Sequence, residues 1–133
     1  MSEEYKPHQT PGTVGWTEIC TRDKAAAIAY YTEVCGWTTE EMELEGGFSY
    51  TMFKVGDEAV AGLVELPDEP KDAPPMWLSY YNGDDVDAAV ARATAAGDTV
   101  RQERVDVSIG SFAIVTDPEG ATFAFWKGNE KDC

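Results

Sequence analysis

The sequence predicts an α+β fold in which two tandem βαβββ modules form one curved mixed sheet around a concave groove. The chain has 133 residues, enough for one domain with a hydrophobic core and hardly enough for two. Each half is typical of a strand, a helix and three further strands, and landmark residues recur between the halves. Trp16, Asp23 and Gly36 recur 61 residues later as Trp77, Asp84 and Gly97, and Phe48 and Gly56 recur 64 residues later as Phe112 and Gly120.

The first module is expected at residues 13–66. It begins with an alternating strand at 13–20 and continues with an alanine-rich helix at 24–35. Asp23 can cap this helix and Gly36 can end it in a left-handed conformation. An apolar stripe along the helix is predicted from Ile28, Tyr31, Val34 and Cys35. Three strands follow, at 37–43, 48–54 and 58–65.

The second module is expected at residues 76–127, after a connector at 67–75 that contains four prolines. Flexible tails are expected at 1–12 and 128–133. Asp84 is the predicted N-cap of a helix that buries Val86, Ala89, Val90 and Ala93. A tight turn is predicted at 117–120. The expected elements are a strand at 76–82, a helix at 85–96 and strands at 98–104, 111–116 and 121–126.

Composition excludes several classes of function. The chain has 10 basic and 25 acidic side chains, a net charge of −15, which disfavours nucleic acid and membrane surfaces as partners. Its single histidine, His8, falls in the N-terminal tail, so a Ser-His-Asp triad or a two-histidine metal site is excluded. The start of the chain has no signal-peptide pattern, and three cysteines without CxxC spacing fit a reducing compartment. We therefore expect a cytoplasmic protein.

Several motifs resemble those of the vicinal oxygen chelate superfamily, which includes glyoxalase I, bleomycin-resistance proteins and extradiol dioxygenases. The similarity extends over about residues 12–127. The motifs in the first half are WTEICTRD from Trp16, Ala29-Tyr30-Tyr31 and Cys35-Gly36-Trp37, and those in the second are WLSY from Trp77, DDVDAAV from Asp84, GSF from Gly110 and DPEGATF from Asp117.

This resemblance implies the duplicated fold and, for a chain of this size, a homodimer. In metal-using members the ligands lie on the first and last strands of each module and are usually His and Glu. Those positions here fall at Trp16, at Trp77 or Leu78, within 59–63, and at Ala124. None of these side chains suits a metal ion, so neither a metal nor another cofactor is expected.

Three candidate site residues alternate along the first strand. Trp16, Glu18 and Cys20 share one face of it. Trp16 and Trp77 could form aromatic walls for a planar or cationic ligand, or they could simply fill the core. Glu18, if buried, would have a raised pKa and could act as a general base or pair with a cation; otherwise it is solvated or bridged to Arg101 or Arg104. Cys20 is expected to be a buried thiol rather than a nucleophile.

Other side chains could complete a ligand site or could be ordinary sheet packing: Tyr50, Met52, Tyr80, Phe112 and Phe125. The favoured function is metal-independent binding of a small organic molecule, cationic or aromatic. The alternative is a lyase, isomerase or hydroxylase-like enzyme, either metal-independent with Glu18 as its base or with a metal at a place that the sequence does not identify, so the sequence leaves catalysis open. A scaffold with a vestigial cavity is a third possibility. Adaptation to salt is a rival explanation of the charge, and the acidic run at 40–45 is typical of a solvated edge strand.

Overall fold

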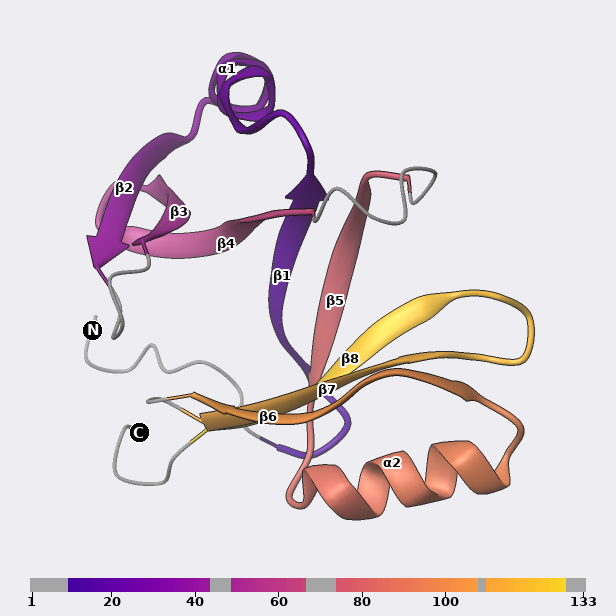
Figure 1. Cartoon of the computed structure of the whole chain (residues 1–133). Helices are drawn as coiled ribbons and strands as arrows, with labels where there is room; N and C mark the ends of the chain where they lie inside the picture. Colours follow the sequence, from indigo (N-terminus) through magenta and orange to yellow (C-terminus); the bar gives the residue numbers. More distant parts are fainter. Residues whose placement is uncertain (1–9, 44–48, 67–73, 108–109, 129–133) are drawn as a thin grey trace. The chain divides into compact units, whose positions relative to one another are not determined.

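The computed structural model describes residues 10–43, 49–66, 74–107 and 110–128 and confirms an α+β fold (Figure 1). His8, Cys133 and most of the connector lie outside these residues. Within the described part, ten elements repeat the order strand, helix and three strands. They are β1 (Val14–Thr21), α1 (Lys24–Cys35), β2 (Thr38–Glu43), β3 (Ser49–Val55), β4 (Glu58–Glu65), β5 (Met76–Asn82), α2 (Val86–Ala95), β6 (Thr99–Val107), β7 (Gly110–Thr116) and β8 (Thr122–Gly128).

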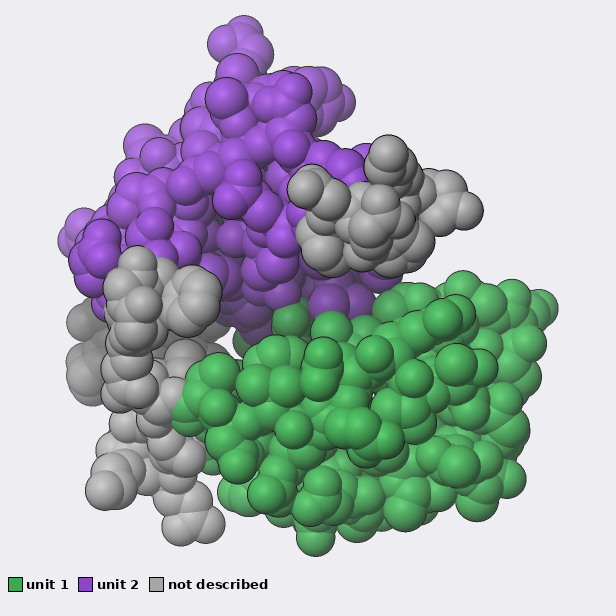
Figure 2. Space-filling model, viewed as in Figure 1, with its two compact units in different colours: residues 1–15, 79–133 green, residues 16–78 purple. Residues whose placement is uncertain are grey.

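The eight described strands belong to one mixed sheet with the order β2-β3-β4-β1-β5-β8-β7-β6. The first and last strands of each module pair in parallel, β1 with β4 and β5 with β8, and the hairpins are antiparallel. The chain divides into two compact units, residues 16–78 and residues 1–15 with 79–133 (Figure 2). The expected groove stays a prediction. In the described part of the chain, neither helix is long and apolar enough to cross a membrane.

In the unit of residues 16–78, helix α1 covers one face of the sheet. Ile19 of β1 packs there with Phe53, Ala61 and Leu63, and Ile28 and Tyr31 of α1 lie against this core. Side chains alternate along a strand, so the neighbours of Ile19 in β1 point to the opposite face. The alternation of β1 therefore separates a core face from the face that carries the candidate site.

Helix α1 begins and ends as the sequence predicts. The Asp23 carboxylate accepts a hydrogen bond from the Ala26 amide at 3.0 Å, and Gly36 ends the helix with a φ of 72°. The predicted apolar stripe is wrong at its C-terminal end, because Val34 is 59% exposed and Cys35 is also exposed. Val34 follows Ile28 by six residues, a rotation of about 240° around the helix, so it faces away from the sheet.

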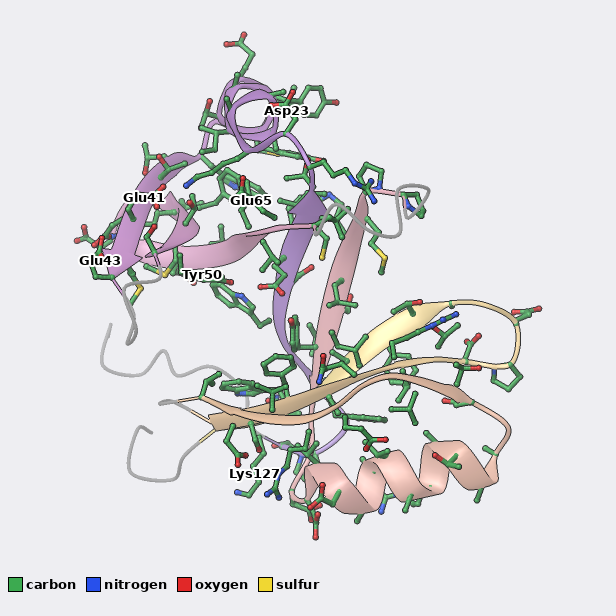
Figure 3. The ribbon with its side chains drawn as sticks, in the orientation of Figure 1. Asp23, Glu41, Glu43, Tyr50, Glu65 and Lys127 are labelled. Carbon is green, nitrogen blue, oxygen red and sulfur yellow. The ribbon has the colours of Figure 1, made fainter. Side chains whose placement is uncertain are left out.

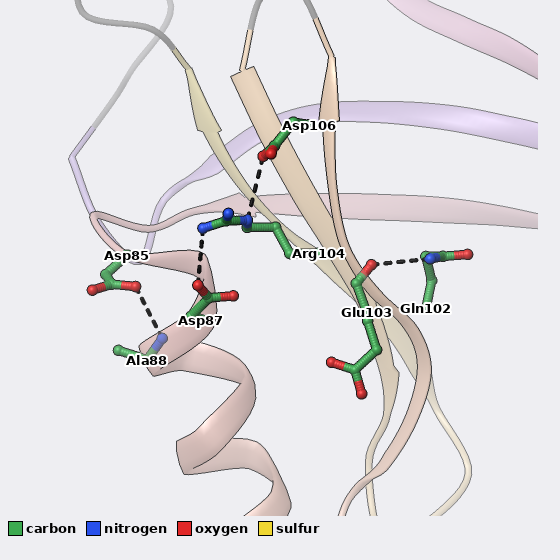
Figure 4. A network of polar contacts seen from close by, with 7 residues as sticks. All are labelled: Asp85, Asp87, Ala88, Gln102, Glu103, Arg104 and Asp106. Atoms are coloured by element: carbon green, nitrogen blue, oxygen red, sulfur yellow. Dashed lines mark hydrogen bonds and ion pairs between the residues drawn. The ribbon is translucent and has the colours of Figure 1, made fainter.

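Helix α2 is capped by Asp85 rather than by the predicted Asp84. The Asp85 carboxylate accepts a hydrogen bond from the Ala88 amide at 3.0 Å (Figure 4). The helix buries Val86, Ala89 and Ala93, as expected, while Val90 is only half-buried. Arg104 of β6 contacts Asp87 of α2 at 2.8 Å and Asp106 of its own strand at 3.3 Å. The first of these contacts connects α2 to the edge strand of its module.

The strand registers show that the two modules match at an interval of 62 residues. Glu18 pairs with Gly62 in the first module, and Tyr80 pairs with Ala124 in the second. The capping residues Asp23 and Asp85 have the same interval. The interval of 61 predicted from Trp, Asp and Gly is therefore wrong by one residue. Trp77 and Leu78 are adjacent in the sequence, as are Asp84 and Asp85. Only the strand register and the helix cap show which residue of each adjacent pair corresponds to Trp16 or to Asp23.

Two local predictions, a tight turn and an acidic edge strand, are confirmed for the described residues; positions 44 and 45 of the acidic run lie outside them. The turn at 117–120 closes through a hydrogen bond from the Gly120 amide to the Asp117 carbonyl at 2.9 Å, with a φ of 104° at Gly120. Strand β2 is an edge strand whose residues are all exposed, and Glu40 on it pairs with Lys54 at 2.7 Å. Charged side chains along this edge discourage pairing with other chains.

Candidate functional site

The candidate site of the first module lies on the face of β1, β4 and β3 that is opposite to α1. Because β1 and β4 are parallel and in register, Glu18 lies beside Gly62. The antiparallel pairing of β3 with β4 places Met52 on the other side of Gly62. Alternation then brings Trp16, Cys20 and Tyr50 to the same face. The structure thus brings together five of the predicted site residues: Trp16, Glu18, Cys20, Tyr50 and Met52.

Three of these side chains form a directed chain of hydrogen bonds. The Trp16 Nε1–H donates to the Tyr50 hydroxyl oxygen at 2.8 Å, and the Tyr50 hydroxyl is 2.8 Å from Glu18 Oε1. An indole can only donate, so the phenol oxygen is the acceptor from Trp16 and its hydrogen points to Glu18. Glu18 Oε1 is therefore an acceptor. Figure 3 shows Tyr50 on the side of β3 and β4 that faces away from α1.

Burial fixes the protonation of the two weak acids beside Glu18. Glu18 itself is only 5% exposed, so the expectation of a solvated carboxylate is wrong. Burial, and next the negative charge of Glu18, raise the pKa of Tyr50, which keeps its proton. The same two causes raise the pKa of Cys20 to about 11. A thiol with this pKa is a poor nucleophile near neutral pH, which favours the buried-thiol interpretation.

Gly62 is a site residue that the sequence reasoning missed. A Cβ atom at this position would overlap the Tyr50 hydroxyl, lying 2.5 Å from Tyr50 Cζ and 3.1 Å from Trp16 Nε1. The Tyr50 ring end therefore occupies the space in which a side chain at 62 would lie. An isolated glycine inside a strand pattern can mark such a close approach, and Gly62 in EAVAGLVE was a signal of this kind.

Trp77 does not share the face of Trp16. Its indole nitrogen donates to the Tyr31 hydroxyl at 3.1 Å, and its ring contacts Tyr31 and Trp37 with centroid separations of 5.2 and 6.3 Å. It lies on the α1 side and is 36% exposed. The predicted pair of tryptophan walls is therefore corrected: at the interval of 62, the counterpart of Trp16 is Leu78.

In the unit of residues 1–15 and 79–133, which is unit 1 in Figure 2, Tyr80 and Phe112 share one face of the sheet, with their ring centroids 6.0 Å apart in an edge-to-face arrangement. They are the counterparts of Glu18 and Tyr50 at the interval of 62. Phe125 pairs with Tyr81 and Ala113 and so lies on the opposite face, against Phe123 at 5.2 Å. The second module thus has apolar or aromatic side chains where the first has its hydrogen-bonded chain.

Comparison of the chain with known families and with solved structures agrees with this architecture. The family model of the Glyoxalase/Bleomycin resistance protein/Dioxygenase superfamily matches residues 13–125. The chain belongs to this superfamily. Among solved structures, the methylmalonyl-CoA epimerase of Mycobacterium tuberculosis shares the fold with a TM-score of 0.62 and 15% identity, over 98% of this chain and 97% of that one.

Curated members of the superfamily include relatives that are about twice as long as this chain. The chain is 40% identical over 117 residues to the "Putative glyoxylase CFP32" of Mycobacterium tuberculosis, covering 87% of itself and 44% of that protein. It is 31% identical over 130 residues to the "Anthracycline biosynthesis protein DnrV" of Streptomyces peucetius, covering 88% of itself and 47% of that protein. The chain thus spans about half the length of these superfamily relatives.

The superfamily's metal positions have unsuitable side chains in this member. On the strands that carry the ligands of metal-using members, the chain has Trp16, Gly62, Leu78 and Ala124. None of them has an oxygen or nitrogen atom that coordinates a divalent cation. Among the described residues, no group of three or more His, Cys, Asp or Glu is arranged to hold a metal ion. The side chains at these positions do not fit a metal.

Proposed function

We propose that the protein binds a small organic molecule, cationic or aromatic, at the face that carries Trp16, Tyr50 and Glu18. The observation that supports this is the part-buried hydrogen-bond chain that ends on the buried Glu18 carboxylate. Burying a carboxylate costs several kcal/mol unless it is paired and hydrogen-bonded. The second module builds the same strands with Leu78, Tyr80 and Phe112, so the fold does not require a carboxylate there.

The chemistry of the side chains suggests the class of ligand. Glu18 Oε1 accepts the Tyr50 hydrogen, and Tyr50 and Cys20 beside it stay neutral, so Glu18 is the group of this trio that can present a negative charge to a ligand. The Trp16 ring can stack on a planar molecule or hold a cation against its face. The net charge of −15 attracts cations to the protein as a whole. A protonated or quaternary amine that carries an aromatic or apolar group fits all three features.

The test is a thermal-shift screen of organic amines, each beside a neutral molecule of the same shape. A ligand at 100 times its Kd adds about 2.7 kcal/mol to the free energy of unfolding, which such a screen detects. Glu18→Gln keeps the shape of the side chain and removes its charge, so we expect it to weaken binding of the amine at least tenfold. Glu65→Gln, at an exposed position on β4, is the matched control and should bind as the wild type does.

Neutral molecules that bind as tightly as the amines would contradict the proposal, and so would a Glu18→Gln variant with unchanged affinity. Tryptophan fluorescence localises the ligand. Quenching should disappear in Trp16→Phe and persist in Trp77→Phe, because Trp77 lies on the other face.

A second candidate function is metal-independent catalysis by a lyase, isomerase or hydroxylase-like enzyme with Glu18 as general base. It is favoured by the Tyr50 hydrogen bond, which orients the carboxylate as a catalytic base must be oriented. The glyoxylase name of a relative is consistent with it. The two functions separate in Glu18→Gln: a base predicts that turnover is lost while ligand affinity is retained, whereas a binding carboxylate predicts that affinity itself falls.

The assembly state and location stay predictions. We propose a homodimer in the cytoplasm, as the superfamily resemblance and the sequence suggest. Light scattering after size-exclusion chromatography measures the mass directly; a dimer of this 14.5 kDa chain would give about twice that value. A mass of one chain at micromolar concentration would contradict the dimer.

A further inference from the structure

We infer that Gly62 and Tyr50 are a positioning pair: the missing side chain at 62 makes room for the Tyr50 hydroxyl, and the hydroxyl orients Glu18. This inference deepens the proposed function, in which Glu18 is the group that binds the ligand. Neither Gly62 nor Tyr50 has to contact the ligand. Their effect on it passes through the carboxylate.

The first support is the space around Gly62. The glycine lies between Glu18 of β1 and Met52 of β3 in the strand register, so the Tyr50 side chain must cross β4 at this point to reach Glu18. A Cβ atom here would overlap the Tyr50 hydroxyl. The tyrosine ring is rigid, so it cannot move away from a new methyl group while keeping both hydrogen bonds.

The second support is a comparison within the chain. At the interval of 62, Gly62 corresponds to Ala124 and Tyr50 corresponds to Phe112. Ala124 pairs with Tyr80 and Ile114 as Gly62 pairs with Glu18 and Met52. The first module therefore has the Tyr50 hydroxyl and no methyl group at position 62. The second module has the Ala124 methyl group and no hydroxyl at position 112. Each combination is compatible with the same strands, but only the first provides a donor to an acid on β1.

The third support is the role that the hydroxyl has. It accepts from Trp16 and donates to Glu18, both at 2.8 Å, so it links two side chains of β1 to one of β3. A phenylalanine ring can fill most of the same volume but can neither accept nor donate. The Gly62–Tyr50 pair thus sets the orientation of the Glu18 carboxylate, in addition to its effect on the stability of the fold.

A double-mutant cycle tests the pair without any ligand. Gly62→Ala should lower the Tm by about 5–10 °C while Tyr50 is present, because the new methyl group displaces the hydroxyl. In the Tyr50→Phe background the same substitution should lower it by less than half as much, because a Phe ring that no longer makes the two hydrogen bonds can shift its Cζ away from the new methyl group, and the second module combines Phe112 with Ala124 in this way. Gly83→Ala is the matched control, because Gly83 has open space around its Cβ position and should tolerate the methyl group. Equal costs of Gly62→Ala in both backgrounds would overturn the inference.

Nuclear magnetic resonance reports the hydrogen bonds directly. We expect the indole N–H signal of Trp16 to shift and its exchange with solvent to become at least tenfold faster in Gly62→Ala, in Tyr50→Phe and in the double variant. The Trp77 indole, bonded to Tyr31, is the internal control and should not change. An unchanged Trp16 signal in Gly62→Ala would overturn the inference.

Ligand affinity then separates positioning from folding. The double variant should fold nearly as stably as Tyr50→Phe but bind the amine at least tenfold more weakly than the wild type. Wild-type affinity in the double variant would overturn the positioning role. If the wild-type protein binds no amine at all, the proposed function fails, while the cycle and the indole signal still decide whether the pair exists.

Discussion

The Tyr50 hydroxyl is the smallest feature on which the candidate site depends. Tyr50→Phe removes two hydrogen bonds, one from the part-buried Trp16 indole N–H and one to the buried Glu18 carboxylate. We expect a loss of roughly 2 kcal/mol in the free energy of unfolding, measured by urea titration. Tyr30→Phe is the control, because Tyr30 is 57% exposed and should change stability by less than about 0.5 kcal/mol. A loss for Tyr50→Phe no larger than that of the control would contradict the buried network.

Cys20 gives a second prediction for single residues, in the alkaline range. Its pKa is raised from 9.0 to about 11 in the folded protein, chiefly by burial and further by Glu18. The folded state therefore holds the proton more tightly than the unfolded state, so this stabilisation is present below pH 9 and is lost as the pH rises towards 11. We expect urea titrations of the wild type to lose roughly 2 kcal/mol more over this range than those of Cys20→Ala.

The exposed Cys35 supplies the control for this pH dependence. Cys35→Ala should lose stability with pH as the wild type does. Iodoacetamide at pH 8 should also label Cys35 long before Cys20, as mass spectrometry of the peptides would show. Equal labelling rates, or an unchanged alkaline slope in Cys20→Ala, would contradict the buried thiol.

At the scale of elements, the helix starts test the one-residue correction between the modules. Asp85 accepts from the Ala88 amide, and its neighbour Asp84 does not have this position in the helix. We expect Asp85→Ala to lower the free energy of unfolding by about 1 kcal/mol, as the loss of an N-cap usually does. Asp84→Ala changes the charge equally and should cost less than about 0.5 kcal/mol in the same urea titration. A larger loss for Asp84→Ala than for Asp85→Ala would contradict the cap at Asp85 and support the interval of 61.

At the scale of the whole molecule, the net charge of −15 should make stability depend on salt. Raising the ionic strength from about 10 mM to about 150 mM shortens the Debye length from about 30 Å to about 8 Å and screens the repulsion among carboxylates. We expect the Tm at pH 7 to rise by several degrees. Near the sequence pI of about 4.2, where the net charge is close to zero, the same salt should change it little. A Tm at pH 7 that does not change with salt would contradict this expectation and would show that the charges are compensated locally.

The prediction of the elements succeeded because their signals are local. The alternation of residues 13–20, the cap at Asp23 and the tight turn at Asp117 all depend on neighbours within a few positions. The registers between strands are set by contacts between distant segments, and there the sequence was wrong by one residue. A shift of one residue turns a strand side chain to the other face, which is why Trp77 was placed beside Trp16. The same shift exchanged Asp84 for Asp85.

The sequence by itself determined the α+β class, the duplication and the presence of an acid in a strand with aromatic neighbours, because periodicity and capping are properties of short segments. Only the tertiary structure decided that Tyr50 reaches Glu18 across Gly62 and that the second tryptophan belongs to the opposite face. The physical reason is steric: which two side chains meet depends on the pairing of strands that are more than thirty positions apart in the chain, and no local pattern encodes that pairing.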